Sequence, residues 1–141
     1  MYDTILLPTD GSTGAQQAAK HAFDLARQYG ATVHVLYVAD TQRDSLTTVG
    51  TEVVDALEAE GRDAVSAIAE SDVAHGIDVE EVVAQGHPDE EILSYVEDNA
   101  VDLVVMATHG RSGLGRYLLG STTEKIVRSS PVPVFTVRVE A

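Results

Sequence analysis

Residues 2–12 read YDTILLPTDGS and decide the fold of this 141-residue chain. The run from Tyr2 to Pro8 is apolar and too short for a helix, which predicts a buried strand. Thr9-Asp10-Gly11 is a turn signal, and Ser12 can cap a helix that continues to Tyr29. A buried strand followed at once by a capped helix is the first half of a strand–helix–strand unit, whose two strands run parallel.

Beyond this opening unit, strands and helices alternate to the end of the chain. Apolar, β-branched runs predict strands, while helical spacing and helix-start signals predict helices. The expected strands cover 32–38, 79–84, 103–107 and 134–139, and the expected helices cover 52–75, a segment that starts at Pro88, and 121–129. The run 103–107 is apolar throughout, as in a parallel strand that is covered on both faces.

This alternation predicts an α/β fold with a single Rossmann-like domain over residues 1–141. Helices are expected on both faces of a doubly wound, five-stranded parallel sheet of order 3-2-1-4-5. Such sheets bind ligands outside the carboxyl ends of their strands, where the strand order reverses. The crevice should therefore open between the first and fourth strands. Gly61, inside the second helix, is expected to be a weak point that costs about 1 kcal/mol relative to alanine.

The composition excludes several classes of protein. The chain carries 23 acidic and 9 basic residues, a formal net charge of −14, and no cysteine. Disulfides and thiolate metal sites are therefore not expected, and the negative charge opposes binding to nucleic acid or to an anionic membrane. With no signal-peptide pattern and no apolar run of about 20 residues, we expect a cytoplasmic protein. Scarce lysine and evenly spread acids favour a salt-rich, halophilic cytosol, and an ordinary acidic protein is the alternative.

Both strand ends that border the expected crevice carry polar signals. The first strand runs into Pro8-Thr9-Asp10, and the fourth runs from Met106-Ala107 into a glycine-rich stretch that reaches Gly120-Ser121-Thr122. Glycine lets backbone N–H groups approach phosphate oxygens, and a helix start adds unpaired donors and a positive dipole end. Basic residues also concentrate between 107 and 138, which suits a small anion. The alternative is a loop whose Ser121 caps the next helix, with bases at that helix's C-terminal turn.

Familiar catalytic and phosphate motifs fail in this stretch. A P-loop would follow Gly110 and Gly115 with a lysine and a hydroxyl residue, but Arg116 and Tyr117 stand there. The dinucleotide fingerprint fails at Leu118, where it requires glycine or alanine. No nucleophile elbow surrounds a serine, and no histidine pair has the spacing of zinc ligands. We therefore expect no catalytic residues and no metal held by the protein itself.

From Ala107 the chain reads Ala-x2-Gly110-x9-Gly120-Ser121. This pattern resembles the ATP-binding motif of the universal stress protein family, Gly-x2-Gly-x9-Gly-Ser/Thr, at three of its four marked positions. The resemblance covers the whole chain, including ILLPTDGS at 5–12, AVDLVVM at 100–106 and SPVPV at 130–134. It implies the fold known as adenine nucleotide alpha hydrolase-like, with ATP as the ligand.

The resemblance also implies roles for single residues. Asp10 would accept hydrogen bonds from the ribose hydroxyls, and a charge at the helix start near Ser12 is the alternative. The backbone of Val38 would face the adenine edge. The other expected contacts with the nucleotide are Pro8, Thr9, Met106, Ala107, Gly110, Arg111, Gly120, Ser121 and Thr122. Arg111 and Arg116 would neutralise phosphate or lie in solvent, and Mg²⁺ or Mn²⁺ would arrive with the triphosphate.

Three functions remain open at this point. The first is a stress-response or signalling module that binds ATP with little turnover, because hydrolysis needs a positioned base and a stabilising charge that are not evident. The second is a slow ATPase or phosphotransferase that uses Asp10, His109 and a metal. The third is a dimeric interaction module that binds no nucleotide. This function remains open because Ala107 stands where the ATP-binding motif has its first glycine.

The last strand is expected to pair with a second copy of the chain. Residues 134–139 are β-prone, lie at a sheet edge, and carry Arg138 as their one charge before Glu140. An antiparallel pair about a two-fold axis would close both edges at once. The family resemblance implies the same homodimer, and an edge shielded by these two charges is the alternative. A proline at Val137 is expected to remove a donor needed for this pairing.

Overall fold

The computed structural model describes residues 1–40, 51–108 and 120–139. The strands are β1 (Thr4–Thr9), β2 (Thr32–Ala39), β3 (Val79–Gln85), β4 (Leu103–Ala107) and β5 (Val134–Val137). The helices are α1 (Thr13–Tyr29), α2 (Thr51–Ala69), the short 3-10 helix η2 (Asp72–Ala74), α3 (Pro88–Asp98) and α4 (Ser121–Ser129). None of the helices in these three segments is long and apolar enough to cross a membrane.

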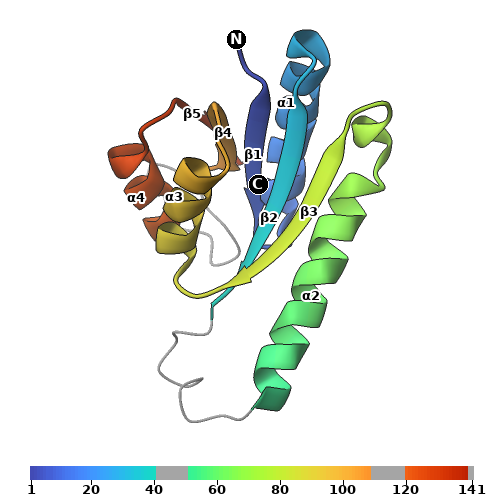
Figure 1. Ribbon diagram of the computed structural model, residues 1–141. Coiled ribbons are helices and arrows are strands. Elements are labelled where there is room, and N and C mark those ends of the chain that lie inside the picture. The colour runs from blue at the N-terminus through green and yellow to red at the C-terminus, as the bar shows by residue number, and fades with distance from the viewer. Residues whose placement is uncertain (41–50, 109–119, 140–141) are drawn as a thin grey trace.

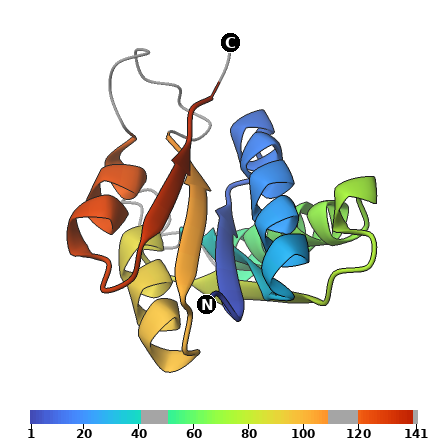
Figure 2. The ribbon, with the colours of Figure 1, turned by 90° about the horizontal axis from the view of Figure 1, so that it is seen from above.

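The five strands form one parallel sheet of order β3-β2-β1-β4-β5, which confirms the predicted fold. Helices α1 and α2 cover one face of the sheet, and α3 and α4 cover the other (Figures 1 and 2). The chain moves outward from β1 to β3 and then crosses back to β4. The helices that follow β1 and β4 therefore leave toward opposite faces, and a crevice opens between the carboxyl ends of these two strands.

Sequence signals set both ends of α1. The Oγ of Ser12 accepts a hydrogen bond from the N–H of Ala15 at 3.3 Å. Gly30 ends the helix with a φ of 68°, and its N–H bonds to the carbonyl of Ala26. Glycine adopts this left-handed conformation at little cost, so the predicted start and stop of α1 are both confirmed.

Two elements end earlier than predicted. Helix α2 ends at Ala69 and not near residue 75. The hydroxyl of Ser71 donates to the carbonyl of Ile68 at 2.6 Å, and the chain then turns into η2. Strand β5 ends at Val137 because β4, against which it pairs, ends at the residue in register with it.

The sheet separates two hydrophobic cores. Ile5 and Leu7 of β1 point into the larger core, under α1 and α2, whereas Leu6 points into the smaller core, under α3 and α4. All three side chains are fully buried, as expected for a central parallel strand. The turn that follows β1 is therefore held against packed layers on both sides of the sheet.

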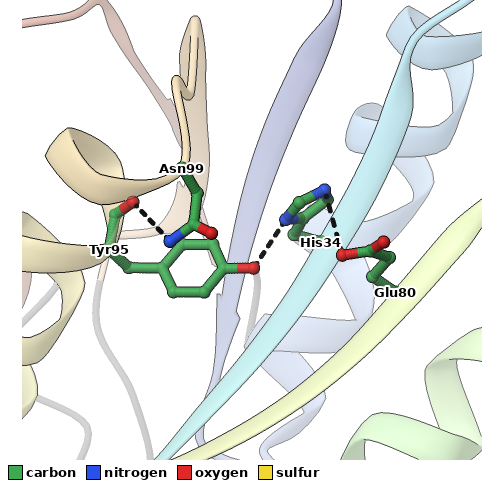
Figure 3. Close-up of polar contacts among 4 residues, drawn as sticks. All are labelled: His34, Glu80, Tyr95 and Asn99. Carbon is green, nitrogen blue, oxygen red and sulfur yellow. Dashed lines mark hydrogen bonds and ion pairs between the residues drawn. The ribbon is translucent and has the colours of Figure 1, made fainter.

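A polar network ties α3 to the sheet (Figure 3). The hydroxyl of Tyr95 on α3 lies 2.6 Å from Nδ1 of His34 on β2, and Nε2 of His34 lies 3.5 Å from the carboxylate of Glu80 on β3. The side-chain amide of Asn99 donates to the Tyr95 carbonyl. Burial, and to a smaller extent the charge of Glu80, raises the pKa of Tyr95, so the phenol keeps its proton at neutral pH. The network secures the C-terminal half of α3 to the sheet.

Asp102 joins the amino ends of β1 and β4. Its Oδ2 accepts hydrogen bonds from the N–H groups of Asp3 at 2.9 Å and Thr4 at 3.0 Å. Because hydrogen bonds to charged groups are worth about 1.5–3 kcal/mol, Asp102→Ala should lower the free energy of unfolding by about 2 kcal/mol. Urea unfolding followed by circular dichroism measures this loss. The exposed Asp98→Ala is the control for removing one negative charge, and equal stability of the two variants would contradict the role of Asp102.

Candidate functional site

A cavity of about 390 Å³ lies at the carboxyl ends of β1, β2 and β4. The predicted site residues that line it are Pro8, Thr9, Asp10, Val38, Met106, Ala107, Gly120, Ser121 and Thr122. Gly110 and Arg111, like His109 and Arg116, lie outside the described residues. The fold thus gathers in one cavity residues that are separated by more than half of the chain.

The turn between β1 and α1 is held by its own side chains. The N–H of Ser12 donates to Oδ1 of Asp10 at 2.9 Å, and the N–H of Gly11 donates to Oγ1 of Thr9 at 3.0 Å. Gly11 has a φ of 81°, which favours glycine. The Asp10 carboxylate therefore sits at the start of α1, as the alternative interpretation of the sequence proposed. It also lines the cavity, and an ionised carboxylate has about four acceptor sites, so the two roles are compatible.

Hydrogen bonds hold the start of α4 against the end of β4. The N–H of Gly120 donates to the carbonyl of Thr108 at 2.8 Å, and the buried Oγ1 of Thr123 donates to the carbonyl of Ala107 at 2.9 Å. The first turn of α4, with the hydroxyls of Ser121 and Thr122, lines the cavity. A helix start presents N–H groups without intrahelical partners and the positive end of the helix dipole. This corner of the cavity therefore suits an anion.

Alanine fits the position where the motif has its first glycine. Among the described residues other than glycine, the only positive φ belongs to Ala100, at 52°. The backbone of Ala107 therefore does not require glycine. Its methyl group is buried and packs in the core that faces α1 and α2.

An apolar wall forms the α3 side of the cavity. It combines the predicted Pro8, Val38 and Met106 with Leu36 of β2 and Ile92 of α3. Apolar walls with a few convergent polar groups are typical of small-molecule sites. The lining residues that sequence reasoning missed are Ser12, Ala15, Leu36, Tyr37, Asp40, Leu57, Pro88, Ile92 and Thr123. In the sequence, Leu57 and Ile92 look like any apolar residue on the buried face of a helix, and this pattern does not show that they border a cavity.

Acidic side chains dominate the charge around the described part of the cavity. Asp10 and Asp40 line it, and the exposed Lys125 of α4 lies 3.9 Å from the partly buried Asp89 of α3 in an ion pair. Within the described segments, no group of three or more histidine, aspartate or glutamate side chains could hold a metal ion.

Comparison with known proteins gives one consistent result. The model of the universal stress protein family matches residues 1–138. Universal stress protein MJ0531 of Methanocaldococcus jannaschii is 34% identical in an alignment of 141 positions that covers 98% of this chain and 83% of that protein. The solved structure of MJ0577, from the same organism, has a TM-score of 0.88 and 33% identity, with 100% of this chain and 99% of that chain covered. A universal stress protein of Archaeoglobus fulgidus, solved in complex with dAMP, shares the fold with a TM-score of 0.66 and 22% identity over 96% of this chain and 97% of that one. The chain therefore belongs to the universal stress protein family.

Proposed function

We propose that this chain binds ATP in the cavity between β1 and β4 and acts as a stress-response or signalling module with little turnover. The observation that carries the proposal is that an apolar wall, the Asp10 carboxylate and the first turn of α4 line one cavity. The same fold holds dAMP in the A. fulgidus protein. ATP is abundant in the cytoplasm, and we therefore propose that the protein is cytoplasmic.

Each part of the cavity suits one part of the nucleotide. The adenine ring would lie against Val38, Met106 and Ile92, and the ribose hydroxyls would donate to Asp10. The phosphates would meet the N–H groups and hydroxyls at the start of α4, around Ser121. When Mg²⁺ or Mn²⁺ is bound, it would neutralise phosphate charge from positions on the phosphate oxygens.

Bound ATP is expected to persist. Phosphoryl transfer to water needs a base that aligns the water and a charge that stabilises the transferred group. Among the described residues that line the cavity, the carboxylates are Asp10 and Asp40, and the proposed binding mode assigns Asp10 to the ribose hydroxyls. We therefore expect no burst of ADP when the protein is mixed with ATP and Mg²⁺ in a quenched-flow experiment. A burst would favour the slow ATPase or phosphotransferase.

Mass spectrometry of ligand released from the purified protein tests the proposal without assuming a ligand. We expect ATP, or ADP from slow turnover during purification. A protein that purifies empty is then titrated with ATP and with GTP, and the melting temperature should rise more with ATP. Release of a flavin or a dinucleotide, or equal shifts with both triphosphates, would contradict the proposal.

We also propose that the protein is a homodimer whose two copies pair through β5. This strand ends the described sheet and exposes Phe135 and Thr136, with Phe135 40% exposed. An exposed strand edge with an exposed aromatic side chain favours pairing with a second strand. The ring of Phe135 also lies 5.7 Å from that of His21 on α1, so α1 would border the same interface.

We also propose that the protein is halophilic, so its melting temperature should depend on the salt concentration. Acidic residues exceed basic ones by 14, so dilution of salt removes the screening of their mutual repulsion. We expect the melting temperature to fall by about 5–10 °C between roughly 2 M and 20 mM KCl. Differential scanning calorimetry at fixed pH measures this. A melting temperature that is constant, or that rises on dilution, would refute adaptation to a salt-rich cytosol.

A further inference from the structure

Gly61 forms a notch in α2 that the ring of Tyr37 fills. A β carbon built at Gly61 would lie 2.5 Å from Cδ1 of Tyr37 and 3.0 Å from both Cγ and Cε1. Side chains in a packed core do not tolerate such approaches, so any residue larger than glycine must displace either the ring or the helix. The prediction that Gly61 is merely a weak point of the helix is therefore incomplete, because its close contact with Tyr37 needs glycine.

Tyr37 is also a wall of the candidate site. It points from β2 toward α1 and α2, is 7% exposed, and lines the cavity together with Leu57. Leu57 precedes Gly61 by one helical turn, so both lie on the face of α2 that meets the ring. Tyr37 is in register with Thr9, the last residue of β1, which directly precedes Asp10. The Tyr37 ring therefore contacts the notch at Gly61, and the backbone of Tyr37 lies beside the strand end that leads into the Asp10 turn.

We propose that the notch at Gly61 positions the Tyr37 ring so that this ring determines how closely the site fits an adenine nucleotide beside the Asp10 turn. This inference rests on the proposed function. Gly61 is a positioning residue that touches no ligand and acts through Tyr37. A methyl group at Gly61 would push the ring toward the cavity or lift α2, and Leu57 with it, away from the cavity. Either movement changes the fit, and small misplacements of a binding wall have large effects on binding.

Calorimetric titration with ATP and Mg²⁺ tests the inference on four proteins: the parent, Gly61→Ala, Tyr37→Leu and the double variant. We expect Gly61→Ala to weaken ATP binding at least about tenfold, and Tyr37→Leu to weaken it about threefold or more. In the double variant, the alanine should change the affinity of Tyr37→Leu by less than about twofold, because the shorter side chain leaves the notch empty.

Gly30→Ala is the matched control. Gly30 has a φ of 68°, and apart from its chain neighbours no atom of the described residues lies within 4 Å of a β carbon built there, so alanine strains the end of α1 without a steric clash. This variant should melt at a lower temperature than the parent and keep the parent's affinity for ATP within about twofold. It separates a loss of stability from a loss of fit.

The outcomes distinguish the inference from the function on which it rests. A parent protein that binds no ATP refutes both. Two results would refute the positioning role of Gly61 while leaving ATP binding intact. In the first, the parent binds ATP and a folded Gly61→Ala binds it equally well. In the second, the alanine weakens ATP binding as much in the Tyr37→Leu background as in the parent. Should Gly61→Ala not fold, Tyr37→Leu decides, and affinity equal to that of the parent overturns the inference.

Discussion

Gly120→Val is expected to abolish ATP binding while leaving the sheet intact. Gly120 lines the cavity as the N-cap of α4, with φ of −62° and ψ of 155°, a conformation that valine also adopts. A branched side chain there would occupy the space through which phosphate reaches the start of the helix. We expect the affinity for ATP to fall at least about 100-fold, equivalent to about 2.7 kcal/mol.

A control for this substitution lies on the same helix. Ser129→Val adds the same branched side chain at the exposed last residue of α4, away from the cavity. It should bind ATP as the parent does, whereas Gly120→Val should bind ATP at least about 100-fold more weakly in calorimetric titration. The melting temperature of Gly120→Val without ATP should decrease only slightly, since valine is a poorer N-cap than glycine. If a folded Gly120→Val retains the parent's affinity, the phosphates do not bind at α4.

Thr136→Pro is expected to convert the proposed dimer into a folded monomer. The carbonyls of Pro133 and Val137 accept hydrogen bonds from the N–H groups of Val104 on β4 and of Thr108, which directly follows β4, at 3.0 and 2.9 Å. The N–H and C=O of one residue point to the same neighbouring strand, and successive residues alternate. Val137 is therefore directed toward β4, and Thr136 toward the open edge. The prediction that proline at Val137 removes an edge donor is wrong, because that proline would break the ladder with β4 instead.

The two prolines form a matched pair. Size-exclusion chromatography with light scattering, at tens of micromolar protein in high salt, should give twice the chain mass for the parent and the single-chain mass for Thr136→Pro. Proline is tolerated in an edge strand where its missing N–H would face outward, so this variant should stay folded, and its melting temperature should fall only by the contribution of the dimer contacts. Val137→Pro should lose about 1–3 kcal/mol of stability through the lost β4 bond. A monomeric parent, or a dimeric Thr136→Pro, would contradict pairing through β5.

Much of the fold follows from local sequence signals. The apolar run at 103–107 and the opening strand predict central strands because a strand that is covered on both faces must be apolar throughout. Ser12 and Gly30 mark the ends of α1 by capping chemistry that acts within a few residues. The alternation of strands and helices then limits the topology to few choices, and the topology alone brings Asp10 and Ser121 to one crevice.

The parts that the sequence does not reveal depend on how helices dock. Ile92 and Leu57 carry the same apolar signal as any buried helical residue, so nothing local shows that they border a cavity. From the sequence, Gly61 is expected only to lower the stability of the helix, and nothing local predicts that its contact with Tyr37 requires glycine. The direction of the N–H of Val137 depends on strand register, which a four-residue strand with two adjacent exposed residues does not specify.

Isothermal titration calorimetry of the purified protein with ATP and Mg²⁺ tests ATP binding in the β1–β4 crevice most directly. We predict one site per chain with a Kd near 1 μM, or about 8 kcal/mol, and weaker binding of GTP. At about 1 mM ATP such a site adds about 4 kcal/mol of stability, which should raise the melting temperature by roughly 10 °C. No binding heat, together with an unchanged melting temperature at this ATP concentration, would contradict the prediction.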